Sequence, residues 1–341
     1  MKHLITGGNG FLGTLIAKEL LKKGEKVCIL DVIDDPDRSQ EIEFIHGSVC
    51  NQDIVRKAMQ GVNIVHHNAA LVPLTKSGKE FWNVNVLGSE CVAKEAIKSG
   101  VDAFIHMSSS AIFGCPNESP ITNGTLTQPV EIYGQSKLEG EQRVMSLCNQ
   151  SKLPLTVIRP RTILGQGRLG IFKILFDWIL DNKNIYIIGS GSGLFQFIHA
   201  IDLMSFYMIT VNTQTPGIYN VGTTTFSSLR NELETLIRIV DSSSKVISLP
   251  INVTIKTLSL LDKAGLSPLA PWHYLTYHKP FYFDTTPLTE LGWTPQYSNQ
   301  QMIQESYQWF LDNKNNLNFN QKSVHRRPVK EKLLWLLKKL S

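Results

Sequence analysis

The chain has 341 residues, 42% hydrophobic and 18% charged, an ordinary globular composition with enough core for about two domains. Five scattered cysteines without a C-x-x-C pair argue against a disulfide framework or a metal site, and neither a signal peptide nor a membrane-spanning run is visible, so we expect a cytoplasmic protein. Residues 322–341 hold seven Lys and Arg against one Glu, a balance of +6 that leaves −1 for the rest of the +5 chain, so the charge gives no reason to expect nucleic-acid binding by the folded body.

A glycine-rich turn stands almost at the first residue. An apolar run over residues 2–5 leads into TGGNGFLG at 6–13, and a helical pattern from Phe11 to Lys23 follows, with Gly24 at its end. Strand, glycine turn and helix begin a dinucleotide-binding unit, because glycine allows the tight bend and close approach to a pyrophosphate, and the helix offers free N–H groups. The residues predicted to contact the cofactor here are Gly7, Gly10, Phe11, Leu12 and Gly13.

Asp31 closes the next apolar run, Val27–Leu30. A carboxylate at this place holds the hydroxyls of an adenosine ribose and repels the additional phosphate of NADP. No arginine follows it directly, and Arg38 lies beyond an acidic run. We therefore expect NAD as the cofactor; the alternative is that Asp31 is an ordinary turn residue.

Up to residue 160, apolar runs alternate with helical patterns. Strands are expected at 64–67, 104–107 and 155–158, and helices at 52–59, 81–98 and 133–150. This alternation predicts an α/β fold with a Rossmann-type, doubly wound parallel sheet as an NAD-binding domain over 1–160. A smaller, interleaved C-terminal substrate-binding part is expected at 161–312, with segments near 195–222 returning to the first domain.

Two polar features follow expected strand ends. Ser108-Ser109-Ser110 ends the strand at 104–107, at the edge of the sheet where ligands bind in open α/β folds. Tyr133 and Lys137 are spaced i, i+4, so they share one helical face. A nearby ammonium favours the phenolate and makes proton transfer by the tyrosine easier. The alternative is a serine-rich turn beside an unrelated surface pair.

Further landmarks follow in order: Asn68-Ala69-Ala70, Asn85 to Ser89, SSSAIFG at 108–114, Arg159-Pro160, Ile218 to Gly222 and Leu291 to Pro295. With the features above, the chain resembles the extended short-chain dehydrogenases/reductases of the NAD-dependent epimerase/dehydratase group from residue 1 to about 312. The resemblance implies a catalytic triad of Ser109, Tyr133 and Lys137, and a homodimer. Further cofactor contacts would come from Asn68, Ala69, Ala70, Asn85 and Pro160, besides Tyr133 and Lys137.

Two departures from this family bear on the substrate. Sugar 4,6-dehydratases carry Asp-Glu directly after the triad serine or threonine, where this chain has Ser110-Ala111, so dehydration is not expected. Phe195 stands where nucleotide-sugar enzymes often place a diphosphate-gripping arginine, and a ring cannot make such bonds. This favours a branch similar to the 3β-hydroxysteroid dehydrogenases, although Arg159, Arg161 and Arg168 remain to grip an anion.

Candidate substrate contacts are Ser110, Arg161, Phe195 and His199. His199 has a structural role as its alternative, and Asp202 is expected to cap a helix. The function expected is NAD-dependent hydride transfer at a secondary alcohol or ketone of a hydrophobic or lipid-linked small molecule. The alternatives are a nucleotide-sugar 4-epimerase and a non-catalytic NAD-sensing protein.

Residues 313–341 read as a polar linker and a basic amphipathic helix. Five leucines between 333 and 340 share one side of the helical wheel, with lysines opposite. Such a helix suits the anionic inner face of a membrane, so peripheral membrane contact through 322–341 is one expectation. Docking on the protein's own body or on a sister subunit is the other.

Overall fold

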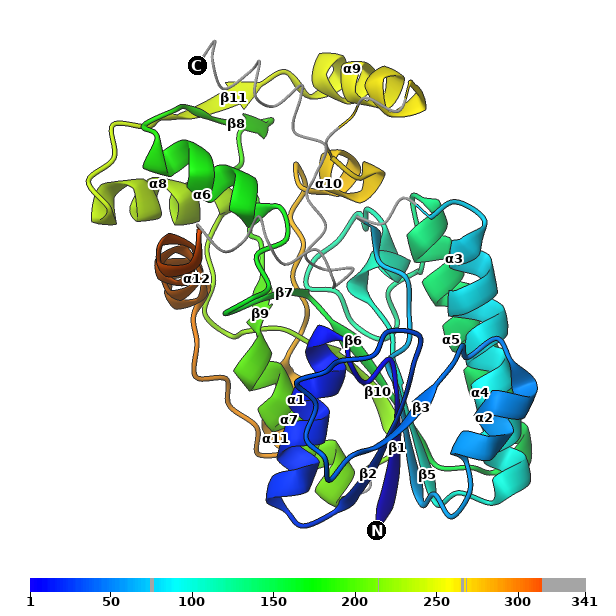
Figure 1. Ribbon diagram of the computed structural model, residues 1–341. Helices are drawn as coiled ribbons and strands as arrows, with labels where there is room; N and C mark the ends of the chain where they lie inside the picture. Colours follow the sequence, from blue (N-terminus) through cyan, green and yellow to red (C-terminus); the bar gives the residue numbers. More distant parts are fainter. Residues whose placement is uncertain (74–76, 214, 265–266, 268, 315–341) are drawn as a thin grey trace.

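The structure is a computed structural model that describes residues 1–73, 77–213, 215–264, 267 and 269–314. The predicted C-terminal helix lies outside these residues. Seven parallel strands form the central sheet in the order β10-β6-β5-β4-β1-β2-β3 (Figure 1). Their bounds are β1 Lys2–Thr6, β2 Lys26–Asp31, β3 Glu43–His46, β4 Ile64–His67, β5 Ala103–Met107, β6 Leu155–Pro160 and β10 Gly217–Val221.

Helices cover both faces of the sheet. On one side lie α1 (Phe11–Lys22), α7 (Ala200–Thr213) and α11 (Thr286–Glu290). On the other lie α2 (Gln52–Ala58), α4 (Ser89–Ser99) and α5 (Ile132–Ser151). Because both faces are buried, the inner strands are continuous apolar runs rather than alternating ones; β4, for example, is buried at all four positions. The predicted Rossmann-type doubly wound sheet is confirmed.

A second group of elements packs above the carboxyl ends of the strands, at the top of Figure 1. Two small parallel sheets pair β8 (Ile185–Ile188) with β11 (Val246–Leu249), and β7 (Thr162–Leu164) with β9 (Phe197–His199). The surrounding helices are α6 (Phe172–Leu180), α8 (Leu229–Ile239), α9 (Ile251–Lys263), α10 (Pro271–Thr276) and α12 (Asn299–Asn313). An aromatic-rich core that includes Phe172, Phe176, Phe195 and Phe281 holds this group together.

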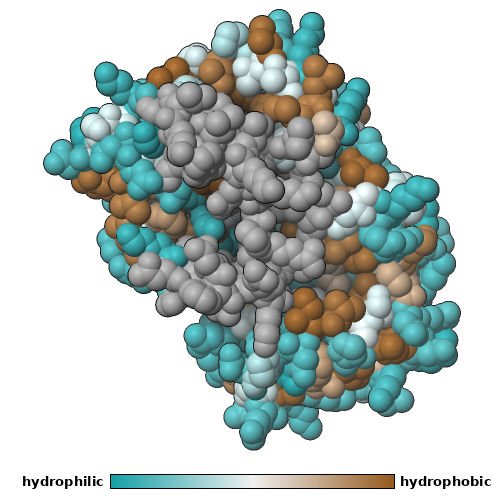
Figure 2. Space-filling model, turned by 45° about the horizontal axis from the view of Figure 1, so that its top comes forward, coloured by the Kyte–Doolittle hydropathy of each residue, from teal (hydrophilic) through white to brown (hydrophobic). Residues whose placement is uncertain are grey.

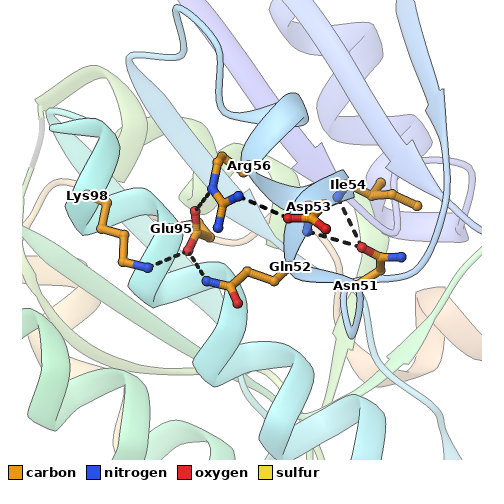
Figure 3. A network of polar contacts seen from close by, with 7 residues as sticks. All are labelled: Asn51, Gln52, Asp53, Ile54, Arg56, Glu95 and Lys98. Carbon is orange, nitrogen blue, oxygen red and sulfur yellow. Dashed lines mark hydrogen bonds and ion pairs between the residues drawn. The ribbon is translucent and has the colours of Figure 1, made fainter.

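A buried carboxylate fastens α2 to α4. Glu95 on α4 is 1% exposed and accepts hydrogen bonds from Gln52 Nε2 at 2.8 Å and Arg56 Nε at 3.2 Å. Lys98 Nζ adds a third at 2.8 Å. Figure 3 shows this network beside the cap of α2, where Asn51 Oδ1 accepts from the backbone. The network thus joins α2 to α4 on one face of the sheet.

Helix α9 is the least buried element of the second group. None of its side chains is fully buried, and Ile251, Val253 and Leu260 are 39%, 65% and 67% exposed. Figure 2 shows brown, apolar surface at the end of the molecule that carries α9 in Figure 1. Among the described residues, no helix is long and apolar enough to span a bilayer. All five cysteines are free thiols.

Local structure departs from the sequence predictions at three places. The helix expected over 81–98 is divided into α3 (Glu80–Trp82), a π-helical stretch η2 (Asn83–Gly88) and α4. Strand β3 was not predicted, because Glu43–His46 is short and carries polar ends. Asp202 does not cap α7: it lies inside the first turn, and its two oxygens accept from Gln296 N and Tyr297 N at 2.9 Å.

Candidate active site

The glycine turn between β1 and α1 is as tight as its sequence predicts. Gly7 has a φ of +66°, and a Cβ there would lie 2.8 Å from Ala69 Cα. A Cβ on Gly13 would lie 2.5 Å from Gly7 O and from Gly8 Cα. Only glycine fits either position without displacing backbone. The turn therefore brings backbone to within reach of a ligand at the end of β1.

The start of α1 is open to an anion. Gly10 occupies the N-cap, no side chain caps the helix, and its first turn holds no acidic residue. Phe11, Leu12 and Gly13 thus present backbone N–H groups with the positive end of the helix dipole, as a bound pyrophosphate requires. These features fit the cofactor predicted from the sequence.

Asp31 ends β2 next to this turn. Its Oδ2 accepts from Asn9 N and its Oδ1 from Ile33 N, both at 3.0 Å. Burial raises the Asp31 pKa, and these backbone hydrogen bonds oppose the rise. Each oxygen keeps a lone pair, so the carboxylate can still accept from two ribose hydroxyls.

The segment after β4 lines the opposite side of the turn. Ala69 N donates to Thr6 Oγ1 at 3.3 Å, and Asn68 Nδ2 donates to His66 O at 3.3 Å, while Asn68 Oδ1 is buried without a partner. Ala70 follows directly. The structure thus brings Asn68, Ala69 and Ala70 to the glycine turn, where the resemblance placed them.

Asn85 has a different position from a simple cofactor contact. Its Oδ1 accepts from Leu71 N at 2.8 Å, and its Nδ2 donates to Leu71 O at 3.2 Å and Ser136 Oγ at 3.0 Å. Every polar atom of this buried amide is therefore engaged within the protein. Asn85, which lies in the π-helical stretch η2, ties the loop after β4 to α5.

Close packing and a cap position the first turn of α5. The Glu131 carboxylate accepts from Tyr133 N at 2.8 Å and from Gly134 N at 2.7 Å. A Cβ on Gly134 would lie 2.7 Å from Ala111 O, so glycine lets α5 rest directly on the 3₁₀ turn η3 (Ser110–Phe113). Tyr133 is thereby held against the strand end that carries Ser109.

Ser109, Tyr133 and Lys137 converge at the end of β5. The Tyr133 side chain hydrogen bonds that of Ser109, whose Oγ also accepts from Ala111 N at 3.1 Å. Lys137 Nζ donates to Met107 O at 2.6 Å. Tyr133 is 9% exposed and Lys137 3%. The three side chains predicted as a triad are thus neighbours in the fold, although they come from two separate segments.

A second cation, Arg168, acts on Tyr133. Burial raises the Tyr133 pKa, and the Ser109 hydrogen bond and the Arg168 charge oppose the rise. Burial also lowers the Lys137 pKa to about 8, which the Glu141 charge partly offsets. The Arg168 charge thus favours the phenolate, and the predicted effect of Lys137 on Tyr133 stays a prediction.

Arg168 also connects the two halves of the site. Its guanidinium lies 5.3 Å from the centre of the Phe11 ring at the start of α1. Burial lowers its pKa to about 10, and the Tyr133 charge opposes this. Arg168 thus stands between the open end of α1 and Tyr133. Sequence reasoning named it only as one of three arginines able to grip an anion.

The remaining candidate substrate residues separate into two places. Arg161 Nη1 donates to Ser110 Oγ at 3.2 Å, and its guanidinium lies 4.9 Å from the Phe195 ring centre, so these three form one group directly after Ser109. His199 is elsewhere: it stacks on Tyr297 at 3.8 Å and pairs with Glu305 at 3.1 Å. These contacts support the structural alternative for His199.

Pro160 lies at the end of β6, where it pairs in register with Val221 of β10.

The buried histidines of β4 are occupied by hydrogen bonds: His66 with Tyr207 at 2.7 Å, and His67 with Thr6 at 2.7 Å. Among the described residues, no cluster of three metal-ligating side chains occurs. The site is therefore an assembly of hydroxyl, phenol and cationic groups facing a glycine turn.

These features define a Rossmann-type dinucleotide-binding protein of the extended short-chain dehydrogenase/reductase class. Residues 3–222 match the family described as the NAD dependent epimerase/dehydratase family. Since this is more than half of the chain, the protein belongs to that family. The predicted family and its cofactor, NAD, are confirmed, whereas the roles of individual site residues stay predictions.

Relatives in this family carry several activities. The chain is 38% identical to the uncharacterized protein y4nG of Sinorhizobium fredii, over 98% of this chain and 85% of the relative. It is 23% identical to the dTDP-D-glucose 4,6-dehydratase of Mus musculus over 96% of this chain and 93% of that protein. It is 30% identical to the sterol-4-alpha-carboxylate 3-dehydrogenase, decarboxylating, of Mus musculus, over 58% of this chain and 55% of that protein.

Solved structures show the same fold. The UDP-glucuronic acid 4-epimerase of Bacillus cereus, in complex with NAD, superposes with a TM-score of 0.75 and 20% identity. The match covers 92% of this chain and 99% of that one. At this identity the likeness supports the fold and leaves the substrate to be argued from the residues of the site.

Proposed function

We propose that the protein is an NAD-dependent oxidoreductase that moves a hydride at a secondary alcohol or ketone. The observation that carries the proposal is the placement of Tyr133 beside Ser109 at the end of β5, with Lys137 buried and bound to Met107 O. Gly7, Gly13 and the uncapped start of α1 would hold the dinucleotide. NAD, when bound, supplies the hydride acceptor.

In this proposal Tyr133 removes or returns the hydroxyl proton at its phenol oxygen. Ser109 Oγ orients the substrate oxygen next to that phenol. Arg168 stabilises the phenolate, since its charge opposes the rise that burial causes in the Tyr133 pKa. Lys137, fixed to Met107 O, orients the ribose side of the cofactor. The buried position of Tyr133 excludes bulk water from the proton transfer.

A hydrophobic substrate is favoured over a nucleotide sugar. Phe195 is 1% exposed and packs against Phe197 at 5.3 Å and Tyr277 at 4.8 Å. It therefore belongs to an apolar core at a position where nucleotide-sugar enzymes often carry an arginine, and it cannot make the charge-assisted bonds that a diphosphate accepts. The sterol dehydrogenase relative supports this substrate class. Ser110-Ala111 in place of Asp-Glu speaks against dehydration.

The second candidate function is that of a nucleotide-sugar 4-epimerase. It is favoured by the similarity of the fold to that of solved epimerases and by the arginines near the site. The two candidates differ in how they use NAD, because an epimerase regenerates it in each cycle. Nucleotide released from freshly purified, denatured protein and identified by mass spectrometry separates them. Near-stoichiometric NAD supports the epimerase; empty protein that binds added NAD reversibly supports the dehydrogenase.

Tyr133→Phe tests the mechanism itself. We expect turnover of NAD with secondary alcohols to fall at least about 100-fold, since general acid–base catalysis contributes that much, while NAD affinity is kept. Tyr186→Phe, a tyrosine on β8, is the matched control and should behave as wild type. Full activity in Tyr133→Phe would refute the proposed role of Tyr133 in proton transfer. Wild-type protein that does not bind NAD would refute the proposed oxidoreductase activity.

A further inference from the structure

Arg161 is a buried cation without an anion. It follows β6 directly and is 1% exposed. Its Nε donates to Gln196 O at 2.9 Å and its Nη1 to Ser110 Oγ at 3.2 Å, whereas Nη2 has no partner. A guanidinium has five N–H donors, so three remain unused. No ion pair of Arg161 occurs among the described residues.

Arg159, a buried arginine on β6, differs from Arg161 because a carboxylate neutralises its charge. Arg159, two residues earlier and also buried, pairs with Glu141 through both Nε and Nη2. A buried guanidinium that lacks a carboxylate is costly. The cost is visible in Arg161, since burial lowers its pKa to about 9. Arg161 therefore differs from an arginine that serves the fold.

Aromatic rings surround the guanidinium but supply no negative charge. Its centre lies 4.0 Å from the Phe281 ring, 4.9 Å from Phe195 and 5.8 Å from Phe283. The titratable neighbour, Tyr277, has a pKa that burial raises, so it stays neutral. Cation–π contacts offset part of the desolvation, yet they leave the free N–H donors unsatisfied.

The place of Arg161 relates it to the reacting groups. Ser110, its hydrogen-bond partner, follows the triad serine directly, and both lie at the carboxyl edge of the sheet. Phe195 stands where the family often has an arginine, and the Arg161 guanidinium lies over that ring. Arg161 thus places a positive charge beside Phe195, although it comes from a different position in the chain than the arginine of the nucleotide-sugar enzymes.

We propose that Arg161 binds an anionic group of the substrate, a carboxylate held by the free Nη1–Nη2 edge with the aromatic rings against its apolar part. This inference rests on the proposed function and narrows its substrate to amphiphilic acids. A carboxylate fits because the fork matches its two oxygens. Tyr277 is the partly exposed ring of the group.

Small probe acids test the site without knowledge of the substrate. Benzoate, phenyl phosphate and the neutral benzyl alcohol are titrated into the full chain with saturating NAD, and Kd values are taken from thermal shifts. In Arg161→Met we expect the benzoate Kd to rise about 10- to 100-fold, as loss of a charge-assisted contact predicts. The benzyl alcohol Kd and the shift caused by NAD should not change.

Arg143→Met is the control, because Arg143 on α5 pairs with Glu90 and Glu139 and does not take part in the site. Without added acid, Arg161→Met should melt at or above the wild-type temperature, whereas a purely structural arginine would lower it. If Arg161→Met fails to fold, Arg161→Lys replaces it, with at least a tenfold rise in the benzoate Kd expected.

Equal Kd values for benzoate in wild type and Arg161→Met would overturn the proposal. A wild-type protein that binds neither benzoate nor phenyl phosphate would overturn it as well. Binding of phenyl phosphate alone, lost in the variant, would assign the anion as a phosphate ester instead of a carboxylate. Failure of the NAD shift in wild type is a different result, and it would overturn the proposed function.

Discussion

The buried pair of Glu141 and Arg159 gives the sharpest stability prediction. Glu141 is 1% exposed and lies one helical turn after Lys137 on α5; Arg159 is 6% exposed and precedes Pro160, the last residue of β6. Arg159 Nε donates to one carboxylate oxygen at 3.1 Å and Nη2 to the other. In Glu141→Gln, one oxygen becomes an NH₂ group that faces a donor, and the guanidinium keeps an uncompensated charge.

Removing one partner of a buried pair costs about 3–5 kcal/mol, and the oxygen that Gln retains places this variant at about 3 kcal/mol. Urea unfolding followed by tryptophan fluorescence and circular dichroism measures the loss. The double variant Glu141→Met/Arg159→Met replaces both charges by apolar side chains, and should return to within about 1 kcal/mol of wild type. A single variant that loses less than about 1 kcal/mol, or a double variant as unstable as the single, would refute the reasoning.

Three further predictions concern single positions. Gly13→Ala places a Cβ 2.5 Å from backbone and should cost about 1–3 kcal/mol and abolish the thermal shift caused by NAD. Gly124→Ala, whose Cβ would lie at an ordinary contact distance of 3.7 Å from Thr122 Oγ1, should do neither. The Lys98 hydrogen bond holds the Glu95 pKa below its ordinary 4.5, so Glu95→Gln should cost about 1–3 kcal/mol in urea at neutral pH, a difference that shrinks as pH falls below about 4.5. Burial lowers the Lys137 pKa from 10.5 to about 8, so the free energy of unfolding of wild type should rise from pH 8 to 10.5. Lys137→Met should lack this rise. Without nucleotide, calorimetry at pH 7 should show the variant to be more stable by about 2 kcal/mol, once the loss of the hydrogen bond to Met107 O is subtracted from the gain.

Local patterns predicted the parts of the site that depend on neighbouring residues. The glycine turn was identifiable because its backbone conformation requires glycine at Gly7 and Gly13. Tyr133 and Lys137 were identifiable because helical spacing places them on one face, and Ser109 because it follows a buried strand. Each inference uses only a few adjacent residues and the rule that ligands bind at strand ends.

Contacts across long stretches of chain were not predictable in this way. The Asp202 carboxylate bonds a backbone segment 94 residues away, and His199 pairs with Glu305. The residues next to Asp202 and His199 in the sequence give no indication of these partners. Similarly, the effect of the Arg168 charge on Tyr133 could not be predicted, because these two residues belong to separate segments of the chain.

The distribution of buried charge links stability to the proposed chemistry. On β6, Arg159 has Glu141 as its partner, whereas Arg161 and Lys137 have no carboxylate in contact among the described residues. A fold selected for stability alone would pair or replace both cations. Their shared place at the carboxyl edge of the sheet, near Ser109, agrees with the proposal that a bound ligand supplies the missing negative charge. Binding of a dinucleotide and an acidic substrate would then recover free energy that the folded protein alone lacks, so ligands should stabilise wild type more than either charge-removed variant.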